Sequence, residues 1–244
     1  DAKGNIYYHF IDEAFYGTDD PTTAADERYG RMDKSKKAVV DATGCLSYKY
    51  AYYTGTDRIQ YVYGYSDAAW TTLVVTYEYN NDATNRLKSM TLVTPDTKGI
   101  LYYSYINEAY FGTDDPSTTQ DERYGRVAGT RRQTALNGEL CHTYTYYGST
   151  TRVATKRAYS DAWTTVAADY TFYDNDTNRM KSKTLPAADA QGNTYYHFID
   201  EAVFGTDDAT TLYDERYGKV DKTKRAAADA DGCLSYDFTY YTGT

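Results

Sequence analysis

The sequence has few of the aliphatic side chains from which deep protein cores are built. Leu, Ile, Val and Phe make up 34 of its 244 residues, whereas Tyr alone accounts for 31. Together with a net charge of −9, so low an aliphatic content is common in disordered chains. Here, however, tyrosines and β-branched residues alternate in runs, as they do in half-buried strands. We therefore expect an ordered but thin sheet, held by cross-strand tyrosine pairs.

Cysteine is scarce as well. The three cysteines, Cys45, Cys141 and Cys233, form no Cys-x-x-Cys pair, and an odd, sparse set excludes a dense disulfide framework. We interpret them as inert, half-buried thiols, with intermolecular pairing as the alternative.

Long apolar runs and large basic clusters are also missing. No run approaches the roughly eighteen apolar residues of a membrane helix. The acidic balance argues against nucleic acid, whose phosphates require clustered Lys and Arg. The longest basic cluster, Lys34, Lys36 and Lys37, is interpreted as a solvated strand face. We predict neither a membrane span nor a nucleic-acid partner.

Catalytic patterns are not found either. Paired carboxylates such as Asp12 and Glu13 point to opposite faces of a strand, so they cannot flank a glycosidic bond. His9 and His197 occupy equivalent places among aromatic residues, far from any candidate nucleophile. The sequence has neither G-x-S-x-G nor H-E-x-x-H, and we predict that the chain is not an enzyme.

What the sequence does have is a long internal repeat. Residues 4–14 (GNIYYHFIDEA) and 192–202 (GNTYYHFIDEA) differ at one position, and residues 99–109 (GILYYSYINEA) lie between them. The repeat copies span 1–95, 96–188 and 189–244, the last being partial. We expect one continuous array of these copies rather than unlike domains. The chain opens and closes within the pattern, which predicts that it is a window on a longer protein.

A shorter period inside each copy predicts the fold. Basic residues follow turns at intervals of 27, 28 and 40, then 26, 27 and 40 residues, at Arg31, Arg58, Arg86, Arg126, Arg152, Arg179 and Lys219. Each copy thus holds two short units and one long unit, whose extra residues fall in an acidic loop. We predict an all-β fold, a tandem β-hairpin repeat array that forms an extended or spiralling sheet of solenoid type.

Alternating tyrosines mark the expected strands. Within each run the tyrosines face one side, and turns rich in Asn, Asp and Gly separate the runs. We expect a structural tyrosine ladder made of Tyr48, Tyr50, Tyr52, Tyr61, Tyr63, Tyr65, Tyr77, Tyr79, Tyr144 and Tyr146.

Several segments share one scheme: Gly or Asn, then Arg, a strand, a glycine turn and Tyr-x-Tyr. They include TYEYNNDATNRLKSMTL from Thr76, YTFYDNDTNRMKSKTL from Tyr170, DERYGRM from Asp26 and DATGCLSYKY from Asp41. This scheme resembles the YD repeats of bacterial Rhs proteins and animal teneurins. The resemblance implies a long ribbon of β-hairpins in a spiralling sheet of a secreted or surface protein. The Tyr-Asp pair is lost at Tyr53-Thr54 and Tyr147-Gly148, and the period departs from the simple family period, which favours a linear array over a closed shell.

A second resemblance lies in Gly4-x-x-Tyr7-Tyr8-x-Phe10. This segment is similar to the hairpin repeats of choline- and glucan-binding cell-wall modules, which stack aromatic side chains around a ligand. Those modules rely on tryptophan, whereas this chain has only Trp70 and Trp163.

The acidic loops are candidate calcium sites. Asp174, Asp176 and Asn178 show the alternate-oxygen spacing of calcium loops. A second candidate set of hard oxygen ligands is Asp19, Asp20, Asp26 and Glu27. The glycine turn and distal bidentate Glu of an EF-hand are missing, so plain turns are the alternative, and calcium is the only cofactor that the sequence suggests. Asn175-Asp176-Thr177 is a glycosylation sequon with Asn175 as acceptor.

These features predict an extracellular or cell-surface structural repeat protein that forms part of a fibre, a sheath or a large adhesin. We expect self-association with further copies or repeats, because unpaired strand edges recruit other chains, and contact with surface glycans is a further possibility. Two alternatives stay open. One is a glycan-binding cell-wall module that uses tyrosine faces for stacking, and the other is a passive YD-repeat shell or stalk of a toxin.

Overall fold

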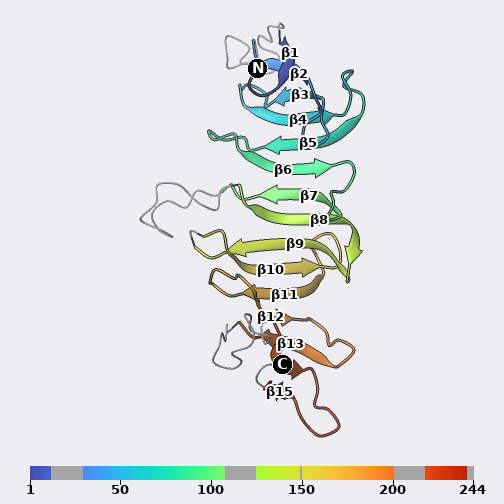
Figure 1. Ribbon diagram of the computed structural model, residues 1–244, viewed down its shortest axis with the longest axis vertical. Helices are drawn as coiled ribbons and strands as arrows, with labels where there is room; N and C mark the ends of the chain where they lie inside the picture. The colour runs from blue at the N-terminus through green and yellow to red at the C-terminus, as the bar shows by residue number, and fades with distance from the viewer. Residues whose placement is uncertain (12–29, 108–124, 149, 201–217, 241–244) are drawn as a thin grey trace, which may run out of the picture. The chain divides into compact units, whose positions relative to one another are not determined.

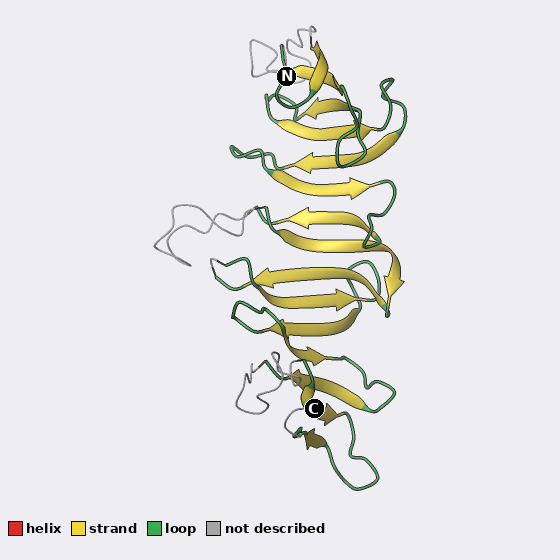
Figure 2. Cartoon of the chain, in the orientation of Figure 1, coloured by secondary structure: helices red, strands yellow, loops and turns green. Residues whose placement is uncertain are grey.

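The computed structural model describes residues 1–11, 30–107, 125–148, 150–200 and 218–240. These residues contain fifteen β-strands and no helix (Figure 2). The chain divides into two compact units, unit 1 with residues 1–109 and 124–133, and unit 2 with residues 110–123 and 134–244. Every strand pairing within a unit is antiparallel, so the predicted all-β array of tandem hairpins is confirmed.

In unit 1 the strands follow one another across the sheet in chain order (Figure 1). They are β1 (Asn5–Phe10), β2 (Met32–Lys37), β3 (Ser47–Tyr52), β4 (Ile59–Tyr65), β5 (Leu73–Tyr79), β6 (Leu87–Leu92), β7 (Ile100–Tyr105) and β8 (Val127–Leu136), of which residues 134–136 belong to unit 2. Pairing of β7 with β8 runs from Ile100 opposite Arg132 to Tyr105 opposite Val127.

Unit 2 repeats this arrangement, again with sequential strands as neighbours. Its strands are β9 (Glu139–Tyr146), β10 (Val153–Tyr159), β11 (Val166–Phe172), β12 (Met180–Thr184), β13 (Asn193–Phe198), β14 (Val220–Arg225) and β15 (Ser235–Asp237). Among the residues with described positions, no helix has the length and apolar character needed to cross a bilayer.

The core of each unit is shallow and built from small side chains. In unit 1, Cys45 and Val75 are fully buried, and Gly64 lies opposite Val75 across the β4–β5 pair. In unit 2, Ala158 lies opposite Ala168, and this pair packs with Tyr170. Such a core agrees with the low aliphatic content, since few large side chains are needed to fill it.

The cysteines are more deeply buried than the sequence suggested. Cys45 and Cys141 are fully buried thiols, whereas Cys233 is half-buried. Burial raises the pKa of the Cys45 thiol, which keeps it protonated and unreactive.

Candidate functional site

One type of turn occurs five times in the described ranges. In each of these turns an aspartate is hydrogen-bonded to a tyrosine seven positions later. One carboxylate oxygen accepts the backbone N–H groups of the second and fourth following residues, and the other accepts the tyrosine O–H. We call this arrangement the Asp–Tyr clamp. Its pairs are Asp1 with Tyr8, Asp41 with Tyr48, Asp96 with Tyr103, Asp189 with Tyr196, and Asp229 with Tyr236.

The clamp of Asp41 shows how the local sequence forms this turn. The carboxylate accepts from the N–H of Thr43 at 3.0 Å and from the N–H of Cys45 at 3.1 Å. Between them Gly44 has a φ of 85°, a conformation that glycine adopts without a steric penalty, and its N–H donates to the Asp41 carbonyl at 2.9 Å. The motif D-x-x-G therefore provides both the side-chain acceptor and the left-handed residue of the turn.

The charge states in this clamp favour a strong hydrogen bond. Burial acts to raise the pKa of Asp41, but hydrogen bonds from Tyr48, Thr43 and Lys37 outweigh it and hold that pKa well below its usual range. Burial and the hydrogen bond to Asp41 raise the pKa of Tyr48. An ionised carboxylate thus faces a neutral phenol, and a hydrogen bond to a charged acceptor is about twice as strong as a neutral one. The pair stabilises the turn and has no proton to exchange near neutral pH.

Asparagine side chains fasten the turns that follow β5 and β11. Asn85 and Asn178 have φ values of 44° and 43°. The Asn178 amide donates to the carbonyls of Val153 and Tyr173 at 2.9 and 3.1 Å, and its oxygen accepts from the Val153 N–H at 2.9 Å. Asn85 makes the same bonds with Ile59 and Asn80. Each asparagine therefore extends the backbone hydrogen bonding beyond the end of the regular strands.

Tyrosines in turns at the same ends of the strands bridge from one hairpin to the next. The hydroxyl of Tyr53, just after β3, donates to the carbonyl of Tyr79 at the end of β5, at 2.6 Å. The Tyr173 hydroxyl donates likewise to the carbonyl of Phe198 at 2.8 Å. Because these bonds skip one strand, they tie together three successive strands at their ends.

The candidate calcium ligands that lie in the described residues have protein partners. Asp174 lies 2.8 Å from the Arg152 guanidinium, and Asp176, which is exposed, lies 3.9 Å from it. The oxygen of Asn178 accepts a hydrogen bond from the Val153 backbone N–H. The described ranges hold no group of three or more His, Cys, Asp or Glu side chains suited to a metal. The second candidate set, Asp19, Asp20, Asp26 and Glu27, lies outside the described residues, and calcium binding stays a prediction.

The glycosylation candidate Asn175 lies in the same exposed turn. Its amide group donates to the Asp200 carboxylate, and its oxygen accepts from the Thr177 hydroxyl at 2.7 Å. Modification of Asn175 stays a prediction.

The predicted ladder tyrosines lie in β3, β4, β5 and β9, but the register does not place them directly opposite one another in β3 to β5. Tyr50 lies opposite Val62, and Tyr63 lies opposite Lys49 on one side and Thr76 on the other. The tyrosines of β3 and β4 therefore project from opposite faces of the sheet. Within β4, Tyr61 and Tyr63 make an i,i+2 ring contact with centroids 5.8 Å apart.

Lysine is the partner of tyrosine that the sequence interpretation missed. One cross-strand row of unit 2 reads Tyr144, Lys156, Tyr170, Lys183 and Tyr196. The Lys156 ammonium lies 4.0 Å from the centroid of the Tyr170 ring, and the Lys183 ammonium lies 5.7 Å from it. In unit 1 the Lys36 ammonium lies 4.3 Å from the Trp70 ring and 5.1 Å from the Tyr7 ring. Cations over ring faces stabilise both partners and cover aromatic surface.

A polar cluster replaces the Asp–Tyr clamp at one turn of unit 2. Asn137 and Gly138 form a tight turn with φ values of 53° and 79°, which is too short for the D-x-x-G motif. Glu139 then accepts from Tyr170, lies 2.8 Å from the His142 imidazole and 3.4 Å from the Lys156 ammonium. Burial opposes ionisation, but the bonds from His142 and Tyr170 prevail and lower the Glu139 pKa to about 2.

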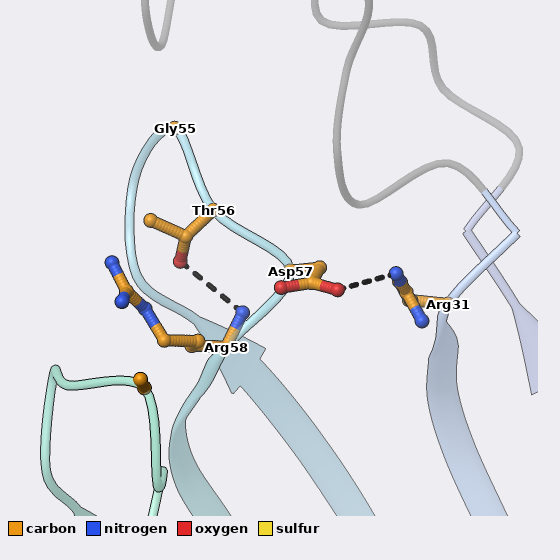
Figure 3. Close-up of a pocket in the computed structure, with 6 residues that line it drawn as sticks. Arg31, Gly55, Thr56, Asp57 and Arg58 are labelled. Atoms are coloured by element: carbon orange, nitrogen blue, oxygen red, sulfur yellow. Dashed lines mark hydrogen bonds and ion pairs between the residues drawn. The ribbon is translucent and has the colours of Figure 1, made fainter.

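Unit 1 also contains an open pocket of about 510 Å³, lined by Arg31, Gly55, Thr56, Asp57, Arg58 and Ala83. Figure 3 shows the Asp57 carboxylate directed toward Arg31, with which it forms an ion pair at 2.6 Å. The Arg58 guanidinium lies on the other side, away from both. Sequence reasoning did not identify this pocket.

The comparisons with known proteins give weak likenesses. No protein-family model and no curated protein matches the chain. Among solved structures it is similar to TcdB2-TccC3, with 10% identity, a TM-score of 0.26, and coverage of 69% of this chain and 10% of that one. It is also similar to TcdB2-TccC3 without its hypervariable C-terminal region, with 10% identity, a TM-score of 0.29, and coverage of 84% and 10%.

A third likeness is to TcdB2-TccC3-TEV, with 13% identity, a TM-score of 0.22, and coverage of 86% of this chain and 12% of that one. The chain thus spans about a tenth of the length of the chains it matches. The resemblance to YD repeats rests on the sequence motifs quoted above.

Proposed function

We propose that this chain is a structural repeat segment whose function is mechanical, as part of an extracellular fibre, sheath or adhesin. The observation that carries this proposal is the recurrence of the Asp–Tyr clamp at five turns, in both units. A catalytic or binding site usually occurs once in a chain. A hydrogen-bonded turn that occurs in every long repeat instead stabilises the whole array. In such arrays each element is stabilised mainly by its neighbours.

The ends of the strands support the same proposal. The asparagine side chains and the bridging tyrosines at the opposite turns join consecutive hairpins, so that pulling on one hairpin loads the next. Together with the clamps at the other ends of the strands, these bonds allow the array to resist fraying without a deep core.

The glycan-stacking alternative is less well supported. A sugar stacks on a free aromatic face, but lysine ammoniums lie over the rings of Trp70 and Tyr170. We therefore rank the structural role above it.

Force spectroscopy on the whole chain tests the mechanical role. We expect resistance to extension in several steps rather than one, and a lower rupture force for one step when Asp41 is replaced by Ala. Extension without measurable force, or an unchanged trace in the variant, would contradict the proposal. Immunogold labelling of intact source cells tests the proposed location.

A further inference from the structure

Arg58 in unit 1 and Arg152 in unit 2 occupy equivalent places with the same backbone geometry. Each directly precedes a strand, β4 or β10. The Arg58 N–H donates to the Thr56 hydroxyl at 3.2 Å, and the Arg152 N–H donates to the Thr150 hydroxyl at 3.1 Å. Any difference between the two guanidinium groups therefore comes from their side-chain surroundings.

Those surroundings differ in charge. In unit 2, Asp174 follows Tyr173 and accepts from the Arg152 Nε–H at 2.8 Å. In unit 1 the corresponding residue is Asn81, because the Asn80 carbonyl accepts from the Asn85 amide just as the Tyr173 carbonyl accepts from the Asn178 amide. An acceptor that is present beside Arg152 is thus replaced by a neutral amide in unit 1.

Arg58 consequently has no acceptor within the described part of the chain. Its guanidinium makes no ion pair there, and its Nε is buried without a hydrogen-bond partner. A buried donor without an acceptor is costly, and more so when it is charged. Arginine remains protonated at all relevant pH values, so it cannot escape this cost by losing its proton.

The pocket beside Arg58 has room for an external acceptor. Its volume of about 510 Å³ falls in the range of sites for small organic ligands. Asp57, the acidic residue of its lining, is paired with Arg31 and turns away from Arg58 (Figure 3). The pocket is therefore lined by the Arg58 guanidinium, and no other lining residue neutralises its charge.

We propose that this pocket binds a small carboxylate ligand of the size of a sugar acid, with Arg58 as the group that recognises it. Carboxylate is the chemistry that Asp174 supplies to the equivalent arginine of unit 2. The planar guanidinium matches a planar carboxylate through two parallel hydrogen bonds, which a neutral sugar cannot accept with comparable strength. The proposed site does not depend on the mechanical role, and it lies in unit 1.

Titration of the full chain with glucuronate, at fixed ionic strength and followed by calorimetry or NMR, tests the proposal. We expect saturable binding of glucuronate, weaker binding of acetate and none of glucose. Arg58→Gln is expected to weaken glucuronate binding about 10- to 100-fold, the effect of losing a hydrogen bond to a charged group. Arg152→Gln is the matched control and leaves the affinity unchanged.

A second variant tests the same site without removing the arginine. Asn81→Asp introduces the carboxylate found in unit 2, which would occupy Arg58 and weaken glucuronate binding at least about tenfold. Circular dichroism establishes that the variants remain folded. Equal affinity in the wild type and Arg58→Gln, equal losses in the Arg58 and Arg152 variants, or binding of inorganic sulfate but not of glucuronate would each overturn the proposal.

Discussion

The two units fill the same cross-strand position of their cores with different pairs of residues. In unit 1, Gly64 lies opposite Val75, and in unit 2, Ala158 lies opposite Ala168. A large residue facing no side chain has about the same volume as two small ones facing each other. The comparison indicates that, in so thin a core, good packing depends on the summed volume of the two facing residues more than on the identity of either one.

Contacts around Gly64 show how little space is left. A Cβ atom at this position would lie 2.5 Å from the Cys45 sulfur, 2.8 Å from a Val75 methyl carbon and 3.2 Å from the Tyr48 ring. Val75 is fully buried and has no room to withdraw. Gly64 is thus required by close approach of its neighbours.

The largest predicted effect comes from breaking this pairing. Gly64→Ala should lower the free energy of unfolding of unit 1 by about 3 kcal/mol, because overpacking displaces buried neighbours. Adding Val75→Ala should recover about 1 kcal/mol or more of that loss, since it restores the pair found in unit 2. Urea denaturation followed by Trp70 fluorescence in a Trp163→Phe background measures both variants.

The matched variant Ala158→Gly in unit 2 serves as control, reported by Trp163 in a Trp70→Phe background. It should cost about 1 kcal/mol, through a small cavity and the greater freedom of glycine in the unfolded chain. If the losses from Gly64→Ala and Val75→Ala simply add, the idea of a shared volume is wrong.

The next largest effect concerns the Asp–Tyr clamp, which unit 1 has before β3 and unit 2 lacks before β9. Asp41→Ala leaves two backbone N–H groups and the Tyr48 hydroxyl without their acceptor, and should cost unit 1 about 2 kcal/mol. Tyr48→Phe removes only one of these bonds and should cost about 1 kcal/mol. Denaturation midpoints measured through Trp70 give both values, and equal losses would show that the hydrogen bond with Tyr48 carries the whole effect and that the two backbone N–H bonds to Asp41 contribute nothing.

Unit 2 should respond to acid through Glu139, which stands in for the missing clamp. The folded-state pKa of about 2 lies below the ordinary value of 4.5, so Glu139 contributes its full stabilisation above pH 4.5. That contribution is lost as the pH falls from about 4.5 to about 2.

Denaturation of unit 2 at pH 6, 4 and 2.5, followed by Trp163 fluorescence, measures this dependence. Glu139→Gln keeps the shape of the side chain but cannot titrate, so the variant should show a flatter acid response between pH 4.5 and 2. An identical response in the wild type and the variant would assign the acid sensitivity to other carboxylates.

The strands could be predicted from sequence, but their partners across the sheet could not. The alternation of Tyr48, Tyr50 and Tyr52 is local, and it correctly predicted a strand with one aromatic face. Which residue lies opposite Tyr50 depends on the register set by the β3–β4 turn, and that residue is Val62 rather than another tyrosine. The expected direct cross-strand pairing of tyrosines is therefore not found in β3 to β5. The period of the tyrosines within one strand does not specify the register between strands.

The side-chain interactions also fall into those that the sequence reveals and those that only the structure reveals. The D-x-x-G-x-x-x-Y spacing of the clamp is visible in the printed sequence and could have been found by comparing the repeats at Asp41, Asp96 and Asp189. The pairing of Arg152 with Asp174 joins residues 22 apart in different turns, so it appears only once the hairpins are folded. Spacing alone suggests calcium ligands there, which stays a prediction, but it does not show that a guanidinium lies nearby.

The smallest predicted effect separates the two arginines. Arg152→Gln breaks a partly exposed ion pair with Asp174 and should destabilise unit 2 by about 0.5 kcal/mol, the usual range for such pairs. Arg58→Gln breaks no ion pair among the described residues, and it removes a charged group with an unsatisfied buried nitrogen, so it should leave unit 1 unchanged or slightly more stable. Urea midpoints in the two single-tryptophan backgrounds provide the measurement. A loss of stability in Arg58→Gln equal to that in Arg152→Gln would mean that Arg58 already has an acceptor within the chain, and the difference in charge between the two turns would then have no energetic consequence.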